Sequence, residues 1–401
     1  MTTLKSGPID RNDDDPAAAG YVARAQELGL VVAADADEIE RRRELPEGLR
    51  RRLIEEGLFR LLLPRSLGGA ELPPPVFVEV IEEIAKADAS TAWCLNQISG
   101  CSMTAAYLDP AAAREVFGAP DGILAWGPGP GEARVVAGGY QVTARFSFAS
   151  GSHDASWLGA HLPIVEHDGR PRHHADGSPV VHTLLFPKSA ARMTDIWHVV
   201  GLRGTGSDQY SVTDLFVPAR FCVARDDPDA RREPGLLYDF SALQLYASGF
   251  AAVAIGIARA TLDAFVELAR DKIPRGARHT LRDNNVVQSQ VAQAEAKLGA
   301  ARAFLFGALA DITAEVARTR RLSLDQRMTI RLAATFAIHQ AMAVVDTAYH
   351  AAGATAIFTT NPFERRFRDI HTVSQQLQGR QQHFETVGQY LMGLAPDTAW
   401  L

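Results

Sequence analysis

Long alanine-rich stretches in the second half of the chain restrict its fold more than any other feature. Apolar residues recur there at helical spacing and predict four helices, over residues 241–270, 285–318, 323–352 and 376–394. Helices of this length, joined by short loops, pack as an up-down-up-down bundle. We therefore expect a C-terminal four-helix bundle within residues 227–401.

The longest apolar run, "GFAAVAIGIARATLDAFVELA", lies inside the first of these predicted helices. Arg259, Asp263 and Glu267 interrupt it. Charges at this spacing favour a buried or amphipathic helix over one that spans a membrane. We expect no membrane association.

The first 122 residues divide into a short arm and a helical domain. Residues 1–20 lack the apolar core of a signal peptide and are predicted to form a partly disordered arm. Within residues 21–122, helical spacing continues up to Pro64, and a second helical stretch begins after the prolines at positions 73–75. This pattern predicts an N-terminal helical domain.

Residues 123–226 show a different pattern. Short β-branched and aromatic runs, including "GGYQVTARFSFASGS", "VVHTLLFPKS" and "YSVTDLFVPARF", alternate with turn residues and predict an antiparallel barrel or sandwich. A polar connection contains His167, His173 and His174, which lack the fixed spacing of metal ligands, so we expect a solvated loop and no metal site. The predicted fold class is α+β, mostly α, with this β-domain between two helical regions.

Composition excludes several functions. A chain of 401 residues is too long for one ordinary hydrophobic core. Its formal net charge is -6, and acidic and basic residues are interspersed along it. No basic stripe favours binding to nucleic acid or to an anionic membrane. The three cysteines, Cys94, Cys101 and Cys222, are too few for a disulfide framework and are predicted to be reduced thiols of a cytoplasmic protein.

The usual nucleotide-binding and hydrolytic motifs are missing. The stretch "GPGPGEA" contains glycines, but it has neither the G-x-G-x-x-G spacing nor a following helix. A Walker loop, a nucleophile elbow and an H-E-x-x-H motif are also absent from the sequence. We therefore do not expect NAD(P)H to bind through the usual fold.

Four motifs, in their order and spacing, resemble the acyl-CoA dehydrogenase superfamily across about residues 25–395: "ADASTAW", "GGYQVTARFSFASGS", "GLRGTGSDQYSV" and "RFRDIHTVSQQ". More closely, they look like its oxygenase branch, the flavin-dependent monooxygenases of two-component systems. The resemblance implies reduced flavin (FMNH2 or FADH2), O2, no metal, and a separate NAD(P)H-dependent flavin reductase that supplies the flavin. It further implies hydroxylation of a small aromatic or polycyclic substrate through a C4a-hydroperoxyflavin.

The choice of branch depends on His371, which we place in a polar turn after "TTNPFERR". The stretch "IHTVSQ" stands where dehydrogenases of the superfamily have a "YEGTSQ"-like motif: Ser374 and Gln375 match, and the glutamate base is replaced by His371. Removing an α-proton calls for an anionic base, whereas an imidazole suits a phenol or a peroxide because its pKa lies near working pH. The resemblance thus implies a catalytic role for His371. A hydrogen-bonded loop histidine without such a role is the alternative.

The resemblance also implies residues that contact the flavin. Ser150 matches a serine near flavin N5, which makes it both a catalytic and a cofactor-binding candidate, with Ser152 as its substitute. Trp126 and Gly127 match the strand that lines the isoalloxazine ring.

An arginine of the stretch "RGARHTLRDNN", either Arg278 or Arg282, is expected on the flavin phosphates, although the "FG" that follows this arginine in the family is missing. Ion pairs of Arg366, Arg368 and Asp369 are expected to hold the "IHTV" segment, with a solvated run of charges as the alternative. The substrate pocket is expected to contain Trp93, Asn96, Tyr246 and Phe250.

Two other functions stay open on the sequence alone. One is an acyl-CoA dehydrogenase that acts on a thioester with an unusual base. The other is a non-catalytic protein that retains the fold for assembly. Members of the superfamily are usually tetramers built through the bundle, so we expect a homotetramer.

Overall fold

The structure is a computed structural model, and it describes residues 16–225, 227–398 and 401. Most of the predicted N-terminal arm, residues 1–15, lies outside the described residues. Residues 16–20 do not belong to an arm, because helix α1 begins at Pro16. Proline is well tolerated in the first turn of a helix, where its missing N–H has no intrahelical partner.

The N-terminal region is helical, as predicted. Asp88 separates its two central helices, α3 and α4, and its carboxylate caps α4 by accepting a hydrogen bond from the Thr91 N–H. The helices are α1 (Pro16–Arg42), α2 (Glu47–Glu55), α3 (Pro74–Ala87), α4 (Ala89–Ser102) and α5 (Pro110–Phe117).

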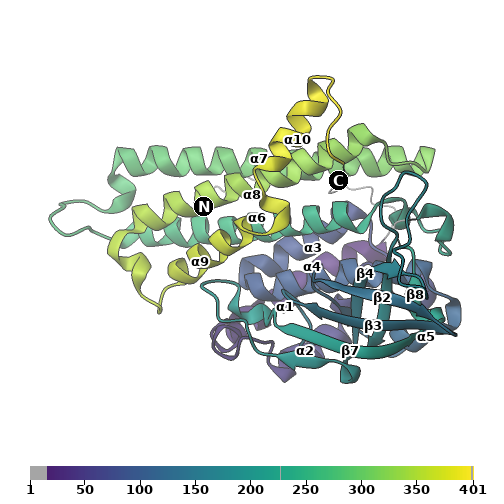
Figure 1. Ribbon diagram of the computed structural model, residues 1–401. Helices are drawn as coiled ribbons and strands as arrows, with labels where there is room; N and C mark the ends of the chain where they lie inside the picture. Colours follow the sequence, from purple (N-terminus) through teal and green to yellow (C-terminus); the bar gives the residue numbers. More distant parts are fainter. Residues whose placement is uncertain (1–15, 226, 399–400) are drawn as a thin grey trace.

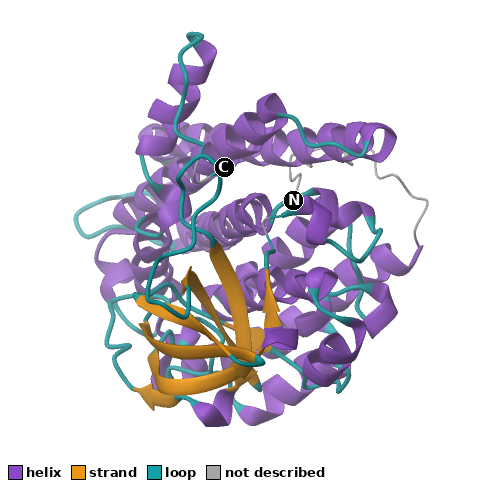
Figure 2. Ribbon diagram, turned by 45° about the vertical axis from the view of Figure 1, so that its right-hand side comes forward, coloured by secondary structure: helices purple, strands orange, loops and turns teal. Residues whose placement is uncertain are grey.

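The β-domain has strands in the order β6-β7-β3-β2-β4-β5-β8, with β1 added beside β4. All pairs are antiparallel except β1 with β4 and β2 with β4, so the predicted, mainly antiparallel β-domain is confirmed. Figure 2 shows these strands gathered on one side of the molecule among the helices. The strands are β1 (Leu124–Ala125), β2 (Gly131–Val136), β3 (Gly139–Phe146), β4 (Trp157–Val165), β5 (Val181–Pro187), β6 (Arg192–Thr194), β7 (Gln209–Pro218) and β8 (Cys222–Val223).

The bundle begins with three long helices that match the prediction within a few residues, and Figure 1 shows them lying side by side. Capping boxes at Ser241 and Ser323 define the starts of α6 and α8. The five helices of this region are α6 (Ala242–Asp271), α7 (Asn285–Thr319), α8 (Leu324–Ala352), α9 (Pro362–Ser374) and α10 (Gln382–Leu391).

The predicted fourth bundle helix, over residues 376–394, is only partly confirmed. Helix α10 occupies Gln382–Leu391 within that range, after a 3₁₀ turn at Leu377–Gly379, and the preceding helix α9, which ends at Ser374, was not expected. Pro362 occupies the first turn of α9, where proline starts a helix and does not break one. His371 therefore lies on a helix and not in the polar turn that the sequence suggested.

Helix α6 packs against α3, α4 and α8 and is buried along most of its length. A Cβ atom at Gly249 would lie 1.9 Å from Asn96 Oδ1, and one at Gly256 would lie 2.6 Å from both Ala85 Cβ and the Glu82 carbonyl oxygen. Only glycine permits these approaches, so the two glycines set the spacing between α6 and its neighbours.

Within the described part of the chain, two helical segments, α6 and the stretch from Leu324 to Ile357, are long and apolar enough to cross a membrane by length and composition alone. Most of each apolar stretch is buried against other parts of the chain. This burial is what the core helices of a multi-helix domain require.

Candidate functional site

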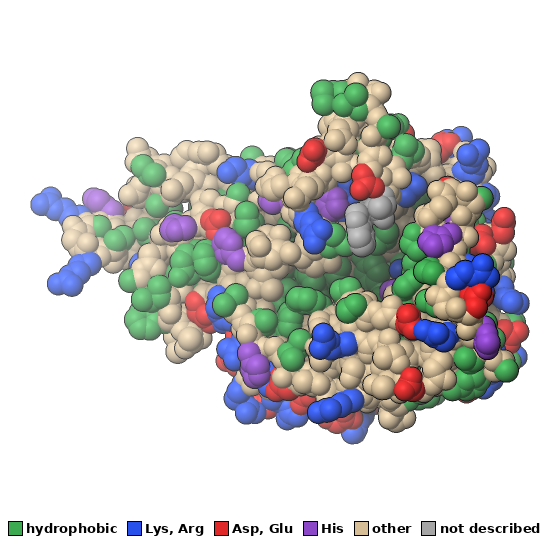
Figure 3. All heavy atoms as spheres, viewed as in Figure 1, with side chains coloured by type: hydrophobic (Ala, Val, Ile, Leu, Met, Phe, Trp, Pro, Cys, Tyr) green, Lys and Arg blue, Asp and Glu red, His purple; other side chains and the backbone are tan. Residues whose placement is uncertain are grey.

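The surface is hollowed between the bundle and the β-domain, and hydrophobic side chains line the hollow (Figure 3). The four predicted pocket residues come together where α4 meets α6. The Trp93 and Phe250 rings lie 4.0 Å apart between centroids, and Phe250 is stacked with Tyr246 at 6.1 Å. Asn96 Nδ2 donates to the Tyr246 carbonyl oxygen at 3.4 Å, and its buried Oδ1 accepts no hydrogen bond. These residues form a buried aromatic wall with one open acceptor.

Ser150 joins this wall. Its Oγ accepts a hydrogen bond of 3.0 Å from Trp93 Nε1 and lies 2.6 Å from Ser207 Oγ. Ser152, two residues later, has a buried hydroxyl without a hydrogen-bond partner. The structure thus places Ser150, one of the two predicted flavin-contacting serines, against the predicted substrate pocket.

Phe148, two residues before Ser150, was missed by the sequence analysis. Its backbone adopts φ +57°, a conformation unfavourable for a bulky residue, and its side chain is 63% exposed beside the Trp197 ring. Such strain persists only where the surrounding structure imposes it, often at ligand sites. An exposed aromatic face at this turn is a suitable platform for a planar ring.

A continuous chain of hydrogen bonds connects Ser150 to helix α9. Ser207 Oγ lies 2.7 Å from Thr205 Oγ1, which donates to the Leu202 carbonyl oxygen at 2.8 Å. The Leu202 N–H in turn donates to Asp369 Oδ1 at 2.6 Å. Leu202 has φ +52°, so Asp369 holds a strained turn in place. The orientation of the Ser150 hydroxyl depends on this chain.

The Asp369 carboxyl is buried, and burial is the main reason that its pKa rises to about 7. The Leu202 N–H lowers this pKa, the neighbouring Asp88 and Glu40 raise it, and Arg368 lowers it. Asp369 therefore acts through a backbone N–H and, contrary to expectation, makes no ion pair with any other described residue.

The two arginines of the same segment differ. Arg368 forms ion pairs with Glu364 at 2.7 Å and with Glu40 at 2.8 Å, as predicted. Arg366 donates instead to the Ala260 carbonyl oxygen.

Trp126 lies beside the other end of the aromatic wall. Its carbonyl oxygen accepts a hydrogen bond from Gln97, and its ring has His161 edge-on at 4.5 Å and the Arg225 guanidinium at 5.2 Å. Neither His161 nor Arg225 belongs to a spaced motif, so no sequence pattern predicts that they lie here. At the neighbouring Gly127, a Cβ would lie 2.0 Å from the Ser147 carbonyl oxygen, so only glycine allows the backbone to approach so closely there.

His371 is not brought together with Ser150 by any contact of the described chain. Its Nε2 lies 2.9 Å from Asp346 Oδ1 on α8, and its ring packs on Phe367 at 4.4 Å. Asp369 lies two residues earlier on the helix, which corresponds to a rotation of about 200° around the helix axis. Its carboxylate accepts the hydrogen bond from Leu202 in the β-domain. His371 therefore faces α8, on the opposite side of α9.

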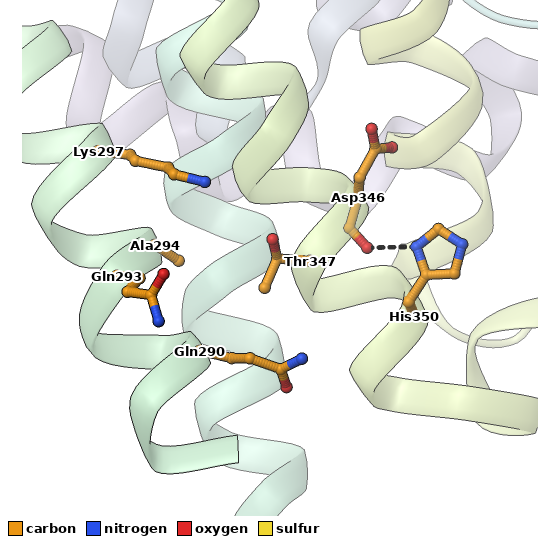
Figure 4. Close-up of a pocket in the computed structure, with 7 residues that line it drawn as sticks. All are labelled: Gln290, Gln293, Ala294, Lys297, Asp346, Thr347 and His350. Atoms are coloured by element: carbon orange, nitrogen blue, oxygen red, sulfur yellow. Dashed lines mark hydrogen bonds between the residues drawn. The ribbon is translucent and has the colours of Figure 1, made fainter. Parts of the chain in front are cut away.

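A shallow groove of about 240 Å³ lies between α7 and α8 (Figure 4). Asp346 lines it together with His350, whose Nδ1 bonds to the Asp346 carbonyl oxygen. The lining is polar, without an aromatic wall, and so does not suit a flat apolar ligand. Its residues are Gln290, Gln293, Ala294, Lys297, Asp346, Thr347 and His350.

Arg278 and Arg282 are exposed in the connection between α6 and α7. Figure 1 shows this connection at the end of the bundle that lies away from the β-domain. Within one chain, the structure does not bring either arginine to Ser150.

Cysteines and possible metal ligands add nothing further to the site. The three cysteines form no disulfide. Across residues 16–225, 227–398 and 401, no group of three or more His, Cys, Asp or Glu side chains is arranged to hold a metal ion.

Comparison with known protein families identifies two matching regions. Residues 25–113 match the family described as acyl-CoA dehydrogenase, N-terminal domain, and residues 248–379 match acyl-CoA dehydrogenase, C-terminal domain. Together they leave the β-domain and the two ends of the chain unmatched.

Individual proteins are similar over nearly the whole chain. Indole-3-acetate monooxygenase of Pseudomonas putida is 28% identical over 96% of both chains. The oxygenase component of an FADH2-dependent resorcinol hydroxylase of Rhizobium sp. is 27% identical over 94% of both. The solved structure of XiaF from Streptomyces sp. in complex with FADH2 and glycerol is 26% identical with a TM-score of 0.87, covering 96% of this chain and 98% of XiaF.

The raised pKa of Asp369 predicts a specific pH dependence. Because an exposed Asp has a pKa of about 3.9, the unfolded chain loses this proton at lower pH than the folded chain does. The contribution of Asp369 to the free energy of unfolding should therefore fall as the pH rises from about 4 to about 7 and then level off. Asp369→Asn keeps an acceptor for the Leu202 N–H but cannot ionise, so it should gain stability relative to the wild type across this range.

Denaturant unfolding of both proteins at several pH values measures the difference. Asp271→Asn, at the exposed end of α6, serves as the control. Parallel curves for the wild type and Asp369→Asn would contradict the assignment of a buried, titrating carboxyl.

Proposed function

Because the chain belongs to the acyl-CoA dehydrogenase superfamily, we propose that it is the oxygenase component of a two-component flavin-dependent monooxygenase that hydroxylates a small aromatic or polycyclic compound. The observation that carries this proposal is the aromatic wall of Trp93, Phe250 and Tyr246, whose Trp93 donates a hydrogen bond to Ser150. A planar substrate and a planar cofactor can meet along such a wall. The names of the similar proteins support the same chemistry.

The residues around Ser150 fit a reduced flavin. The exposed Phe148 ring provides an apolar face, and the Ser150 hydroxyl lies within the same turn to hydrogen-bond the ring edge. The buried Ser152 hydroxyl, which has no hydrogen-bond partner among the described residues, is a second polar group of this turn. When bound, reduced flavin activates O2 and transfers one oxygen atom to the substrate, while the other leaves as water.

The chain contributes positioning and the exclusion of water. Trp93 and Phe250 are buried and shield the Ser150 hydroxyl from solvent, which limits wasteful release of H2O2. The chain of hydroxyl groups through Thr205 and Ser207 holds the Ser150 hydroxyl in one orientation before the reaction begins.

The proposal also covers the source of the reduced flavin and the oligomeric state. An oxygenase component depends on a separate reductase, which we propose uses NAD(P)H to deliver the reduced flavin in the cytoplasm. We also propose a homotetramer. Arg278 and Arg282 lie away from the β-domain of their own chain, so either one would reach a flavin phosphate from a neighbouring subunit.

Oxygen transfer is the direct test of the function. The protein is mixed with FMN or FAD, an independent NADH-dependent reductase and a panel of phenols and indoles under ¹⁸O2. We expect one ¹⁸O atom in at least one product and a matching decrease in H2O2. If all of the NADH consumed is recovered as H2O2 with every compound tested, the proposed function is wrong.

Phe148→Ala should weaken the binding of reduced flavin about 5-fold, because the loss of ring stacking costs on the order of 1 kcal/mol. The exposed ring contributes little to folding, so the melting temperature should stay unchanged. Anaerobic calorimetry measures the binding of both reduced FMN and reduced FAD. Phe216→Ala on β7, where the ring is 49% exposed, is the matched control and should bind flavin normally. Normal flavin binding by Phe148→Ala would remove Phe148 from the site.

His371 is proposed as a catalytic residue on the resemblance of its motif, and its pairing with Asp346 makes a test essential. His371→Gln keeps a donor for Asp346 but cannot transfer a proton. If the imidazole takes part in proton transfer, hydroxylation should slow about 100-fold while reduced flavin binds normally. Asp346→Asn, which retains the imidazole, is the companion variant. Unchanged turnover in His371→Gln would show a histidine that only joins α9 to α8.

A further inference from the structure

A positively charged side chain lies beside the aromatic pocket without a counter-ion among the described residues. Arg225 lies two residues beyond the end of β8, and its guanidinium lies 5.2 Å from the Trp126 ring centroid. Its Nε is buried and donates no hydrogen bond. The Arg225 side chain is half-buried, and a buried N–H of a guanidinium is costly unless an acceptor completes its environment.

A second nitrogen without a hydrogen-bond partner among the described residues belongs to His161, whose ring packs against the same Trp126 indole. His161 packs edge-on against Trp126, its Nδ1 lies 2.7 Å from Thr183 Oγ1, and its buried Nε2 has no partner. Burial, and to a smaller extent the charge of Arg225, holds the pKa of His161 well below its usual value. His161 is therefore neutral, and its free Nε2 offers one more hydrogen bond beside the guanidinium.

Arg225 is close to the substrate end of the aromatic wall. Burial raises the pKa values of Cys101 and Tyr246, and the nearby charge of Arg225 opposes this rise in both. The Tyr246 hydroxyl lies 3.3 Å from Cys101 Sγ, and its ring stacks with Phe250. Arg225 thus lies at one end of the wall, and Ser150 lies at the other end, beyond Trp93.

The guanidinium is a planar fork of donors that matches a carboxylate through two parallel hydrogen bonds. We propose that Arg225, with His161 beside it, binds a carboxylate group of the substrate. The substrate is then an aromatic acid, with its carboxylate at Arg225 and its ring along Tyr246 and Phe250 toward Ser150. This inference rests on the proposed function, whose aromatic substrate it specifies.

Binding of acids and of their matched amides tests the proposal. Anaerobic calorimetry with the full-length protein and reduced flavin compares phenylacetate, 4-hydroxyphenylacetate, indole-3-acetate and 2-naphthoate with their primary amides. In the wild type, we expect at least one acid to bind about 10- to 100-fold more tightly than its amide, as hydrogen bonds to a charged group contribute. Arg225→Gln should abolish this preference, and Arg225→Lys, which keeps the charge, should retain part of it.

Arg192→Gln, at an exposed arginine on β6, is the matched control and should keep the full preference. Circular dichroism and melting curves establish folding. If Arg225→Gln fails to fold, the wild type and Arg225→Lys still decide the matter, since both must prefer an acid over its amide.

Three results would overturn the inference. These are the absence of any acid preference in the wild type, a full preference in folded Arg225→Gln, and a loss of flavin binding in Arg225→Gln with the preference intact. The last result would assign the cation to a flavin phosphate. Because binding is measured without turnover, failure of the proposed function appears separately, as absent ¹⁸O transfer by the wild type.

Discussion

The close packing of α6 against α3 and α4 is the constraint on which the rest of the structure depends. Gly249 lies directly against Asn96, and Gly256 lies against Ala85, at separations that no other residue permits. Tyr246 and Phe250 flank the first of these glycines and so reach the Trp93 side of α4. The aromatic wall of the pocket is therefore a consequence of how closely two helix backbones approach each other.

The second organising feature is the chain of hydrogen bonds from Asp369 to Ser150. It passes through the turn at Leu202, whose backbone is strained, and through two buried hydroxyl groups. Strain of this kind persists only where neighbouring groups enforce it. Helix α9 thereby controls the orientation of a serine in the β-domain, which links the C-terminal region to the proposed flavin site.

The sequence predicted much of this site but not its details. The grouping of Trp93, Asn96, Tyr246 and Phe250 agrees with the contacts in the structure, and Ser150 bonds to this group. These residues belong to motifs whose order can be compared with a family. Phe148 and Arg225 carry no such signal, because an isolated aromatic or cationic residue looks the same in a sequence whether it lines a pocket or faces solvent.

The position of His371 shows that a motif can predict a role for a residue without predicting its neighbours. Its motif predicts a role, and the polar stretch after a proline suggests a turn, whereas Pro362 starts a helix in the structure. On that helix, two residues of separation place Asp369 and His371 on nearly opposite faces. The neighbours of the imidazole follow from this helical geometry and not from the motif.

The sequence by itself determined the three long bundle helices, the main strands and the order of the three regions, because spacing, caps and turn residues act over a few neighbouring positions. Only the tertiary structure decided which distant groups meet. Asp369 reaches an amide 167 residues away, His371 pairs with Asp346, and Arg225 lies over Trp126. Burial leaves each of these polar groups few possible partners, and the packing of the chain determines which partners are within reach.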